Sequence, residues 1–225
     1  MSIIVRDNFI DINGTILTAH VPTLGTIWEI SGLTSLPVNF TINSNQLSTA
    51  VQFATTAAMV ISDIIKESQF VQVTYISKAS AVNDTSFMLL VRALGTAGTF
   101  SAYVLEIFPL TGNVRILGYN GGIVVYNSGI TVVAIPNGAI IKFLVIGTAL
   151  KVYVDGELKI AKVNGAVTQA GKVGIGFAAS FGLTNAYVFD NFIGDDTEVS
   201  LSGSFASGRG RPRRTIQAFN PGDGI

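Results

Sequence analysis

The sequence predicts an all-β protein, a two-sheet antiparallel β-sandwich with a flexible C-terminal tail. Turn signals rich in Gly, Asn and Pro recur about every eight to twelve residues, which is the spacing typical of a sandwich or jelly roll. The runs between these turns alternate apolar and polar residues, as half-buried strands do. No stretch has the period of a long amphipathic helix. Hydrophobic residues make up 48% of the 225 residues, which is ample for a large core.

Strands in the first half follow from this alternation. A strand over 3–12 ends at the turn Asn13-Gly14, and a connector at 15–22 carries the only histidine, His20. The segment 57–66 is ambiguous between a helical turn and a strand, and its β-branched residues favour a strand. The other strands expected here are 26–31, 39–42, 49–55, 70–78, 87–94 and 100–108.

Glycine-containing turns separate the strands of the second half. Thr111-Gly112-Asn113, Asn120-Gly121-Gly122 and Pro136-Asn137-Gly138 each lie between two apolar runs. Such turns are expected where consecutive strands pair as hairpins. The strands predicted between them are 114–119, 123–126, 131–135 and 139–146.

Asp155-Gly156 is a strong hairpin signal. A two-residue loop would pair Tyr153 with Leu158 and would point the aliphatic residues of the two strands to opposite faces. A three-residue loop would pair Val152 with Leu158 and would keep Leu150, Val152, Leu158 and Ile160 on one face. We favour the three-residue loop, because strand register follows the buried face.

Two further strands close the pattern. In the run 171–177, Gly174 and Gly176 share one face while Val173, Ile175 and Phe177 share the other. The last strand, 186–192, contains Asp-Asn-Phe at 190–192, which repeats Asp-Asn-Phe at 7–9. This repeat is consistent with first and last strands that lie side by side.

Three motifs carry a resemblance to a known family. The segments Lys-Val-Tyr-Val-Asp-Gly at 151–156, Gly-Lys-Val-Gly-Ile-Gly-Phe at 171–177 and Asp-Asn-Phe at 190–192 look like the C-terminal half of a concanavalin A-like (laminin G-like) jelly roll. The opening, from Asp-Asn-Phe at 7–9 to Trp28, resembles the start of such domains in bacteriophage structural proteins. The resemblance covers roughly residues 5–195. It implies a fold that hosts lectins, glucanases and scaffolds, so it does not fix the function.

The composition favours a component of a larger assembly. Charged residues make up only 12% of the chain, about half the usual share, so part of the surface must be apolar or uncharged. Residues 1–199 hold ten basic and thirteen acidic residues, a net charge of −3, whereas 200–225 hold four Arg and one Asp, a net charge of +3. The body has no basic surface typical of a nucleic-acid-binding protein. The start of the chain lacks a signal-peptide pattern, and no apolar run is long enough to span a membrane.

We therefore expect a jelly-roll domain at 1–199 and a Gly/Ser/Arg-rich tail at 200–225. The tail is too polar to fold alone. Its arginines could bind nucleic acid or another anionic surface, or pair with carboxylates of a protein partner, and its apolar side chains favour docking onto a protein. The residues expected to dock are Arg209, Arg211, Arg213, Arg214, Ile216, Phe219 and Ile225.

Catalytic chemistry finds little support in the sequence. A retaining glycosidase needs two carboxyl groups about 5–5.5 Å apart, and a glucanase of this fold is expected to carry them at Glu-x-Asp-x-x-Glu spacing. The acidic candidates Asp155, Glu157, Asp190, Asp195 and Asp196 do not reproduce that spacing. There is no cysteine, and we expect His20 to be a surface or turn residue. The chain is therefore predicted not to be an enzyme and to need no cofactor.

The sequence does not exclude two kinds of binding site, one for calcium and one for a glycan. Calcium needs six to eight oxygen ligands, and Asp7, Asp190, Asp195 and Asp196 could supply some of them if the terminal strands pair. A glycan would need an aromatic surface, and the candidates are Trp28, Tyr119, Tyr126 and Tyr187.

From these observations and the resemblance, the first expectation is a non-enzymatic bacteriophage virion protein, either a capsid decoration (cement) protein or a head or tail fibre domain. It would be made in the host cytoplasm, would form a homo-oligomer and would dock onto a capsid or tail protein through its tail. The alternative is a carbohydrate-binding adhesion module for a host surface glycan. A glycoside hydrolase is the remote alternative.

Overall fold

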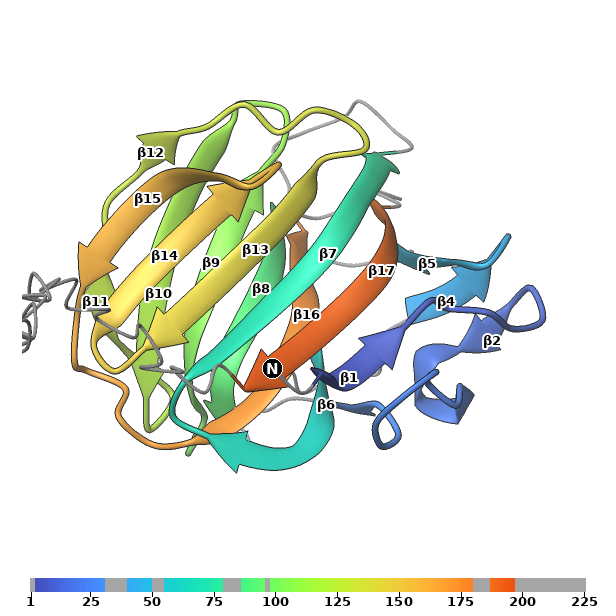
Figure 1. Ribbon diagram of the computed structural model, residues 1–225, viewed down its shortest axis with the longest axis horizontal. Coiled ribbons are helices and arrows are strands. Elements are labelled where there is room, and N and C mark those ends of the chain that lie inside the picture. Colours follow the sequence, from blue (N-terminus) through green and yellow to red (C-terminus); the bar gives the residue numbers. More distant parts are fainter. Residues whose placement is uncertain are drawn as a thin grey trace, which may run out of the picture.

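The computed structural model describes residues 3–30, 40–49, 55–78, 86–95, 98–179 and 187–196. They form two antiparallel sheets packed face to face (Figure 1), which confirms the predicted β-sandwich. In this part of the chain, no helix is long and apolar enough to cross a bilayer. The predicted tail, 200–225, lies outside the described residues, and so do its docking residues.

The first sheet, sheet A, has nine strands in the order β15-β14-β13-β7-β17-β5-β4-β2, with β1 paired to β17. Its strands are β1 (Ile3–Asp7), β2 (Thr15–Ile16), β4 (Phe40–Asn43), β5 (Gln46–Thr49), β7 (Gln69–Lys78), β13 (Ile140–Ile146), β14 (Ala149–Val154), β15 (Glu157–Val163) and β17 (Tyr187–Asp196).

The second sheet, sheet B, has eight strands in the order β11-β10-β9-β8-β16-β6-β3, with β12 paired to β10. A 3₁₀ turn, η1 (Leu17–Ala19), follows β2. The strands of sheet B are β3 (Glu29–Ile30), β6 (Thr55–Lys66), β8 (Ser86–Leu94), β9 (Ser101–Phe108), β10 (Asn113–Asn120), β11 (Ile123–Asn127), β12 (Thr131–Val132) and β16 (Gly171–Ala179).

Alternating side chains of both sheets form one core between them. The inward face of β16 carries Val173, Ile175 and Phe177, all buried, as the sequence predicts. Aromatic rings bridge the two layers, and Tyr75 of β7 stacks on Phe87 of β8 with ring centroids 5.4 Å apart. Such pairs add to the free energy of burial through their ring geometry.

The predicted strands are confirmed with a few corrections. The ambiguous segment 57–66 lies within β6, so the strand interpretation is correct. The strand expected over 3–12 ends at Asp7, because the chain turns where the amide of Phe9 donates to Asp7 Oδ1 and Phe9 takes φ 51°. The strand expected over 131–135 is only Thr131–Val132. Of the strand expected over 49–55, Thr49 ends β5 and Thr55 begins β6, while 50–54 lie outside the described residues.

The register predicted for the 155–156 hairpin is wrong. The loop has two residues, Asp155 and Gly156, both with positive φ, and Tyr153 pairs with Leu158. A bulge between Val152 and Tyr153 then places Ile160 opposite Val152. The bulge sets one extra residue in β15 and so turns Ile160 into the core while Leu158 points to solvent.

The first and last strands do pair, as the repeated tripeptide suggested. Asp7 lies opposite Phe192 and Ile3 lies opposite Asp195. Because β17 also pairs with β7 and β5, this last described strand lies inside sheet A and connects β1 of the N-terminal lobe, residues 3–30, to the rest of the sheet.

Arg92 ties three connections together at one end of the sandwich. It lies in β8 with a left-handed backbone, φ 55°, and its side chain is buried. Its guanidinium donates to the carbonyl oxygens of Glu67, Val167 and Gly147 at 2.7, 2.5 and 2.7 Å. One cation thus satisfies carbonyls from the β6–β7, β15–β16 and β13–β14 connections.

Candidate functional site

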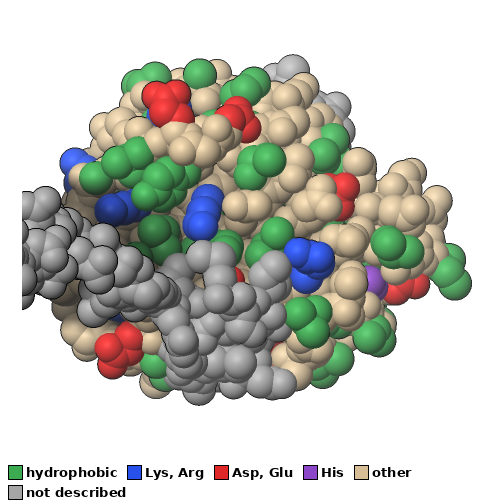
Figure 2. All heavy atoms as spheres, in the orientation of Figure 1, with side chains coloured by type: hydrophobic (Ala, Val, Ile, Leu, Met, Phe, Trp, Pro, Cys, Tyr) green, Lys and Arg blue, Asp and Glu red, His purple; other side chains and the backbone are tan. Residues whose placement is uncertain are grey.

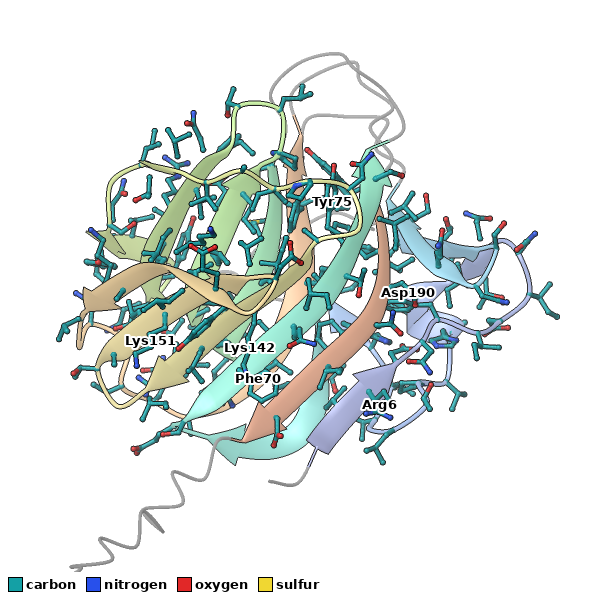
Figure 3. The ribbon with its side chains drawn as sticks, turned by 45° about the horizontal axis from the view of Figure 1, so that its top comes forward. Arg6, Phe70, Tyr75, Lys142, Lys151 and Asp190 are labelled. Carbon is teal, nitrogen blue, oxygen red and sulfur yellow. The ribbon has the colours of Figure 1, made fainter. Side chains whose placement is uncertain are left out.

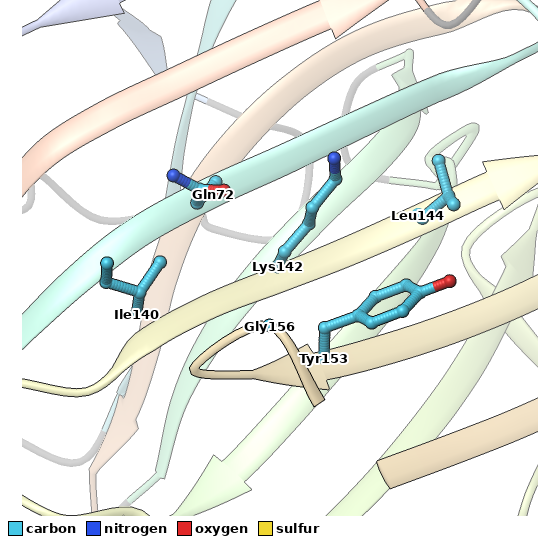
Figure 4. A pocket seen from close by; sticks show the side chains of 6 residues that line it. All are labelled: Gln72, Ile140, Lys142, Leu144, Tyr153 and Gly156. Atoms are coloured by element: carbon cyan, nitrogen blue, oxygen red, sulfur yellow. The ribbon is translucent and has the colours of Figure 1, made fainter. Parts of the chain in front are cut away.

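A hollow of about 380 Å³ lies on the outer face of sheet A (Figure 4). It crosses three neighbouring strands, since Lys142 of β13 pairs with Gln72 of β7 on one side and with Tyr153 of β14 on the other. Its volume falls at the lower end of the range for small-ligand sites. The residues that line it are Gln72, Ile140, Lys142, Leu144, Tyr153 and Gly156.

Strand alternation explains why these side chains face outward. In β13 the odd-numbered residues Ile141, Phe143 and Val145 are buried in the core, so Lys142 and Leu144 project from the opposite face. The same alternation in β14 buries Val152 and Val154 and leaves Tyr153 half-buried on the outer face.

The Asp155–Gly156 turn forms one wall of the hollow. Asp155 accepts a hydrogen bond from the Ile140 amide at its Oδ1, 2.9 Å away, and its own amide donates to the Ile140 carbonyl oxygen, also at 2.9 Å. These two bonds hold the turn against the start of β13. A rigid turn keeps the opening of the hollow fixed, and preorganised sites lose less entropy on binding.

Lys142 is the main charge in the hollow. Its ammonium lies 3.6 Å from the centroid of the Phe70 ring, within the range of a cation–π interaction. Burial lowers the pKa of Lys142, and the nearby Asp195 acts in the opposite direction. The ammonium is therefore partly stripped of water and is held in place by Phe70.

Together these groups provide what a sugar requires. An aromatic ring, Tyr153, can stack on the apolar face of a pyranose. The amide of Gln72 can both donate to and accept from hydroxyl groups, and the ammonium of Lys142 donates.

The structure brings none of the four predicted glycan-contact aromatics into this hollow. Trp28 and Tyr187 are buried, so the prediction that they present a surface to a sugar is wrong. The Trp28 indole donates to Asp7 Oδ2 at 2.7 Å and packs edge-on against Phe192. Tyr119 and Tyr126 are half-buried on β10 and β11 of the other sheet.

His20 is not the surface residue that the sequence suggests. Its side chain is 2% exposed, and it lies between two carboxylates. The Nε2 atom is 2.9 Å from Asp7 Oδ1, and the Nδ1 atom is 2.9 Å from Asp11 Oδ2. This cluster holds together the N-terminal lobe, with Asp7 at its centre.

The four aspartates considered for calcium are not gathered in one place. Asp7 is used by His20, Trp28 and the Phe9 amide. Asp190 lies opposite Thr74 and Asp195 opposite Phe70, at different points along β17, and Asp196 lies opposite Gln69. Among the described residues, no three acidic or histidine side chains are grouped to hold a metal ion.

The outer face of sheet B carries one acidic side chain on strands β8 to β11 and β16, that of Glu106. It is 7% exposed, accepts from Ser86 Oγ at 2.8 Å and pairs with Arg115 Nε at 2.5 Å. These strands offer no second carboxyl group for the pair that a glycosidase needs. The other candidates, Asp155 and Glu157, flank the β14–β15 turn, where Asp155 is a structural hydrogen-bond acceptor.

The sequence contained part of the signal for the hollow. Alternation in 149–154 already placed Tyr153 on the face opposite the valines. It did not show that Gln72 and Lys142 lie beside it, because that depends on pairing between strands about 70 residues apart in the chain.

Comparisons with known proteins agree with the fold. No protein-family model and no curated protein matches this sequence. Among solved structures, the carbohydrate-binding module CBM66 from Bacillus subtilis is similar with a TM-score of 0.56 and 14% identity, over 74% of this chain and 97% of that one. A Bacillus licheniformis β-glucanase has a TM-score of 0.58 and 13% identity, over 84% and 95%.

The carbohydrate recognition domain of Emp46p, in a potassium-bound form, is similar with a TM-score of 0.54 and 8% identity, over 75% of this chain and 88% of that one. The chain thus has the concanavalin A/galectin-like jelly-roll fold predicted from its sequence. At these identities the similarity concerns the fold, which serves both binding modules and hydrolases.

Proposed function

We propose that this protein is a non-enzymatic carbohydrate-binding module that holds a glycan in the hollow across β7, β13 and β14. The observation that carries the proposal is the position of Tyr153, half-buried beside Lys142 and Gln72 on an otherwise open sheet face. An aromatic ring flanked by hydrogen-bonding side chains is suited to a sugar, which has apolar ring faces and polar edges.

The fold supports this proposal, because two of the similar structures are described as a carbohydrate-binding module and a carbohydrate recognition domain. The lack of a carboxyl pair on β8 to β11 and β16 favours binding over hydrolysis.

A glycan array probed with the full chain, followed by calorimetric titration of the best ligand, tests the proposal. Tyr153→Ala should weaken binding about tenfold, because it removes the stacking surface, while Tyr153→Phe should retain most of the affinity. Tyr119→Ala, on the outer face of sheet B, is the matched control and should bind as the unaltered chain does. Equal weakening by Tyr119→Ala and Tyr153→Ala, or no glycan bound at all, would contradict the proposal.

A second candidate is a structural protein of a virion, a capsid decoration protein or a head or tail fibre domain. The observation that favours it is the apolar surface of the N-terminal lobe, where hydrophobic side chains gather at the lower right of Figure 2. Exposed apolar patches of this kind often contact other proteins. Its exposed aliphatic residues are Ile10, Ile12, Ile16, Val21, Leu24, Ile27 and Ile30.

Immunogold labelling of virus particles from the native source tests this second candidate. Regularly spaced label on capsids or tails would support a structural role, and unlabelled particles would contradict it. Lysine substitutions at Ile12 and Val21 should then abolish binding of the purified chain to particles, because they put charges into the apolar surface.

A further inference from the structure

Two lysines lie close to Tyr153 on this face of sheet A, Lys142 within the hollow and Lys151 beside it. Lys142 lies directly across from Tyr153 in the β13–β14 pair, and Lys151 pairs with Leu144 of the same two strands. Tyr153 and Lys151 are two residues apart in β14, so they project from the same face about 7 Å apart. Lys142 and Lys151 are diagonal neighbours, with Cβ atoms about 7–8 Å apart. Figure 3 shows both lysines and Phe70 on this side of the sheet.

The three side chains therefore form a triangle with the ring at one corner and an ammonium at each of the others. In Figure 2, lysine side chains lie among hydrophobic ones over β13, β14 and β15. A site for a neutral sugar would need the apolar surface but not the two separated cations.

The two ammonium groups differ in their surroundings. Lys142 is held over the Phe70 ring and is near Asp195. Lys151 is half-buried, and no other described residue forms an ion pair with it. Lys159, the extra residue of the bulge in β15, is already paired with Glu157 at 2.6 Å. Asp195 thus offsets charge at Lys142, whereas Lys151 remains without an ion pair among the described residues.

We propose that the hollow is selective for an anionic glycan, one whose sugar rings carry carboxylate or sulfate groups. This inference rests on the proposed carbohydrate-binding function and narrows its ligand. The sugar ring stacks on Tyr153, its hydroxyl groups bond to Gln72, and its acidic group lies between Lys142 and Lys151. A half-buried ammonium gains more from such a partner than a fully hydrated one does, because the effective dielectric constant is lower.

The Lys142 side chain is held in place before the ligand arrives. Its ammonium rests on the Phe70 ring, whereas for Lys151 strand pairing fixes the backbone. Contacts made by preordered side chains lose little rotamer entropy, so they discriminate between ligands more sharply than mobile surface lysines do.

The test is calorimetric titration of the full chain with four polymers at fixed salt. Polygalacturonate carries only carboxylates and dextran sulfate carries only sulfates, and their neutral counterparts are fully methyl-esterified polygalacturonate and dextran. We expect at least one acidic polymer to bind tenfold or more tightly than its neutral counterpart. The acidic polymer that binds identifies which anionic group is recognised.

Three variants locate the effect. Lys142→Gln and Lys151→Gln should each weaken binding of the acidic polymer at least about threefold. Lys172→Gln removes the same charge on the other sheet, where Lys172 pairs with Glu29, and should leave binding unchanged. Equal weakening by all three variants would mean diffuse charge attraction and would overturn the inference.

Failure of the inference is distinct from failure of the proposed function. If acidic and neutral polymers bind equally and only Tyr153→Ala weakens them, the site is a carbohydrate site without preference for anions. If neutral glycans on the array bind while both acidic polymers do not, the anionic preference is again wrong. If no glycan of either kind binds, both proposals fall.

Discussion

His20 Nε2 lies 2.9 Å from Oδ1 of Asp7, and both side chains are buried within the N-terminal lobe. The second Asp7 oxygen accepts the Trp28 indole N–H at 2.7 Å. Removing the imidazole would leave a buried carboxylate short of a partner, which is among the most destabilising changes a core can suffer. His20→Ala should therefore lower the free energy of unfolding by about 3 kcal/mol.

Urea denaturation followed by tryptophan fluorescence would measure this loss, since Trp28 is the only tryptophan. Thr18→Ala, in the adjacent turn η1, is the control and should change the stability by less than about 0.5 kcal/mol. Similar stabilities for His20→Ala and the unaltered chain would mean that the cluster does not hold the lobe.

Acid should weaken the same cluster through Asp11. The hydrogen bond from His20 lowers the pKa of Asp11 below its ordinary value of 3.8. A carboxyl group with a lowered folded-state pKa contributes stability above its ordinary pKa, and this contribution disappears as the pH falls through the folded-state pKa. Melting temperatures recorded from pH 5 to pH 2 should fall more steeply below 3.8 for the unaltered chain than for Asp11→Asn. Parallel curves would contradict the assignment.

Lysine should not replace Arg92 without a loss of stability. Lysine keeps the charge, but a single ammonium cannot reach the carbonyls of Glu67, Val167 and Gly147 at once. Arg92→Lys should lower the free energy of unfolding by more than about 2 kcal/mol, because hydrogen bonds of a charged group to buried carbonyls are lost. Arg115→Lys, at a more exposed ion pair, should change it by less than about 1 kcal/mol, and equal effects would refute a special role for Arg92.

The bulged hairpin makes a direct prediction about two aliphatic residues. Ile160 is 3% exposed and Leu158 is 47% exposed. Ile160→Ala should lower the free energy of unfolding by about 2–4 kcal/mol, because it leaves a cavity in the core. Leu158→Ala should change it by less than about 0.5 kcal/mol. Thermal denaturation of the two variants compares them, and a large loss at Leu158 would instead favour the three-residue loop.

The fold was predictable because its evidence is local. Alternation and turn residues lie within ten residues of one another, and they indicated the strands from β7 to β17 with small errors at their ends. The hairpin register was not predictable in the same way. The bulge beside Val152 depends on which side chain of the hairpin fills the core between the two sheets. The sequence of the hairpin alone does not determine that packing.

The functional residues were harder to predict for a related reason. A lone histidine in a connector is typical of a surface residue. The fold of the lobe nevertheless brings His20 beside the carboxylates of Asp11 and Asp7, which lie nine and thirteen residues away in the sequence. Trp28 was a candidate for sugar binding because aromatic residues serve both in glycan contacts and in core packing. Only the burial of its ring shows that Trp28 is a core residue. Lys142 and Gln72 meet through strand pairing that no local pattern records.

The place of β17 inside sheet A has a consequence for how the chain matures. It is the last described strand, yet it lies between β7 on one side and β1 and β5 on the other. Until β17 has been made, sheet A has a gap through its middle, and β1 and β5 lack the strand that joins them to β7. Sheet A can therefore be completed only once β17 has been made, through contacts of very large sequence separation, which are expected to form slowly. A nascent chain in this state exposes unpaired strand edges, so its production should depend on chaperones that shield them.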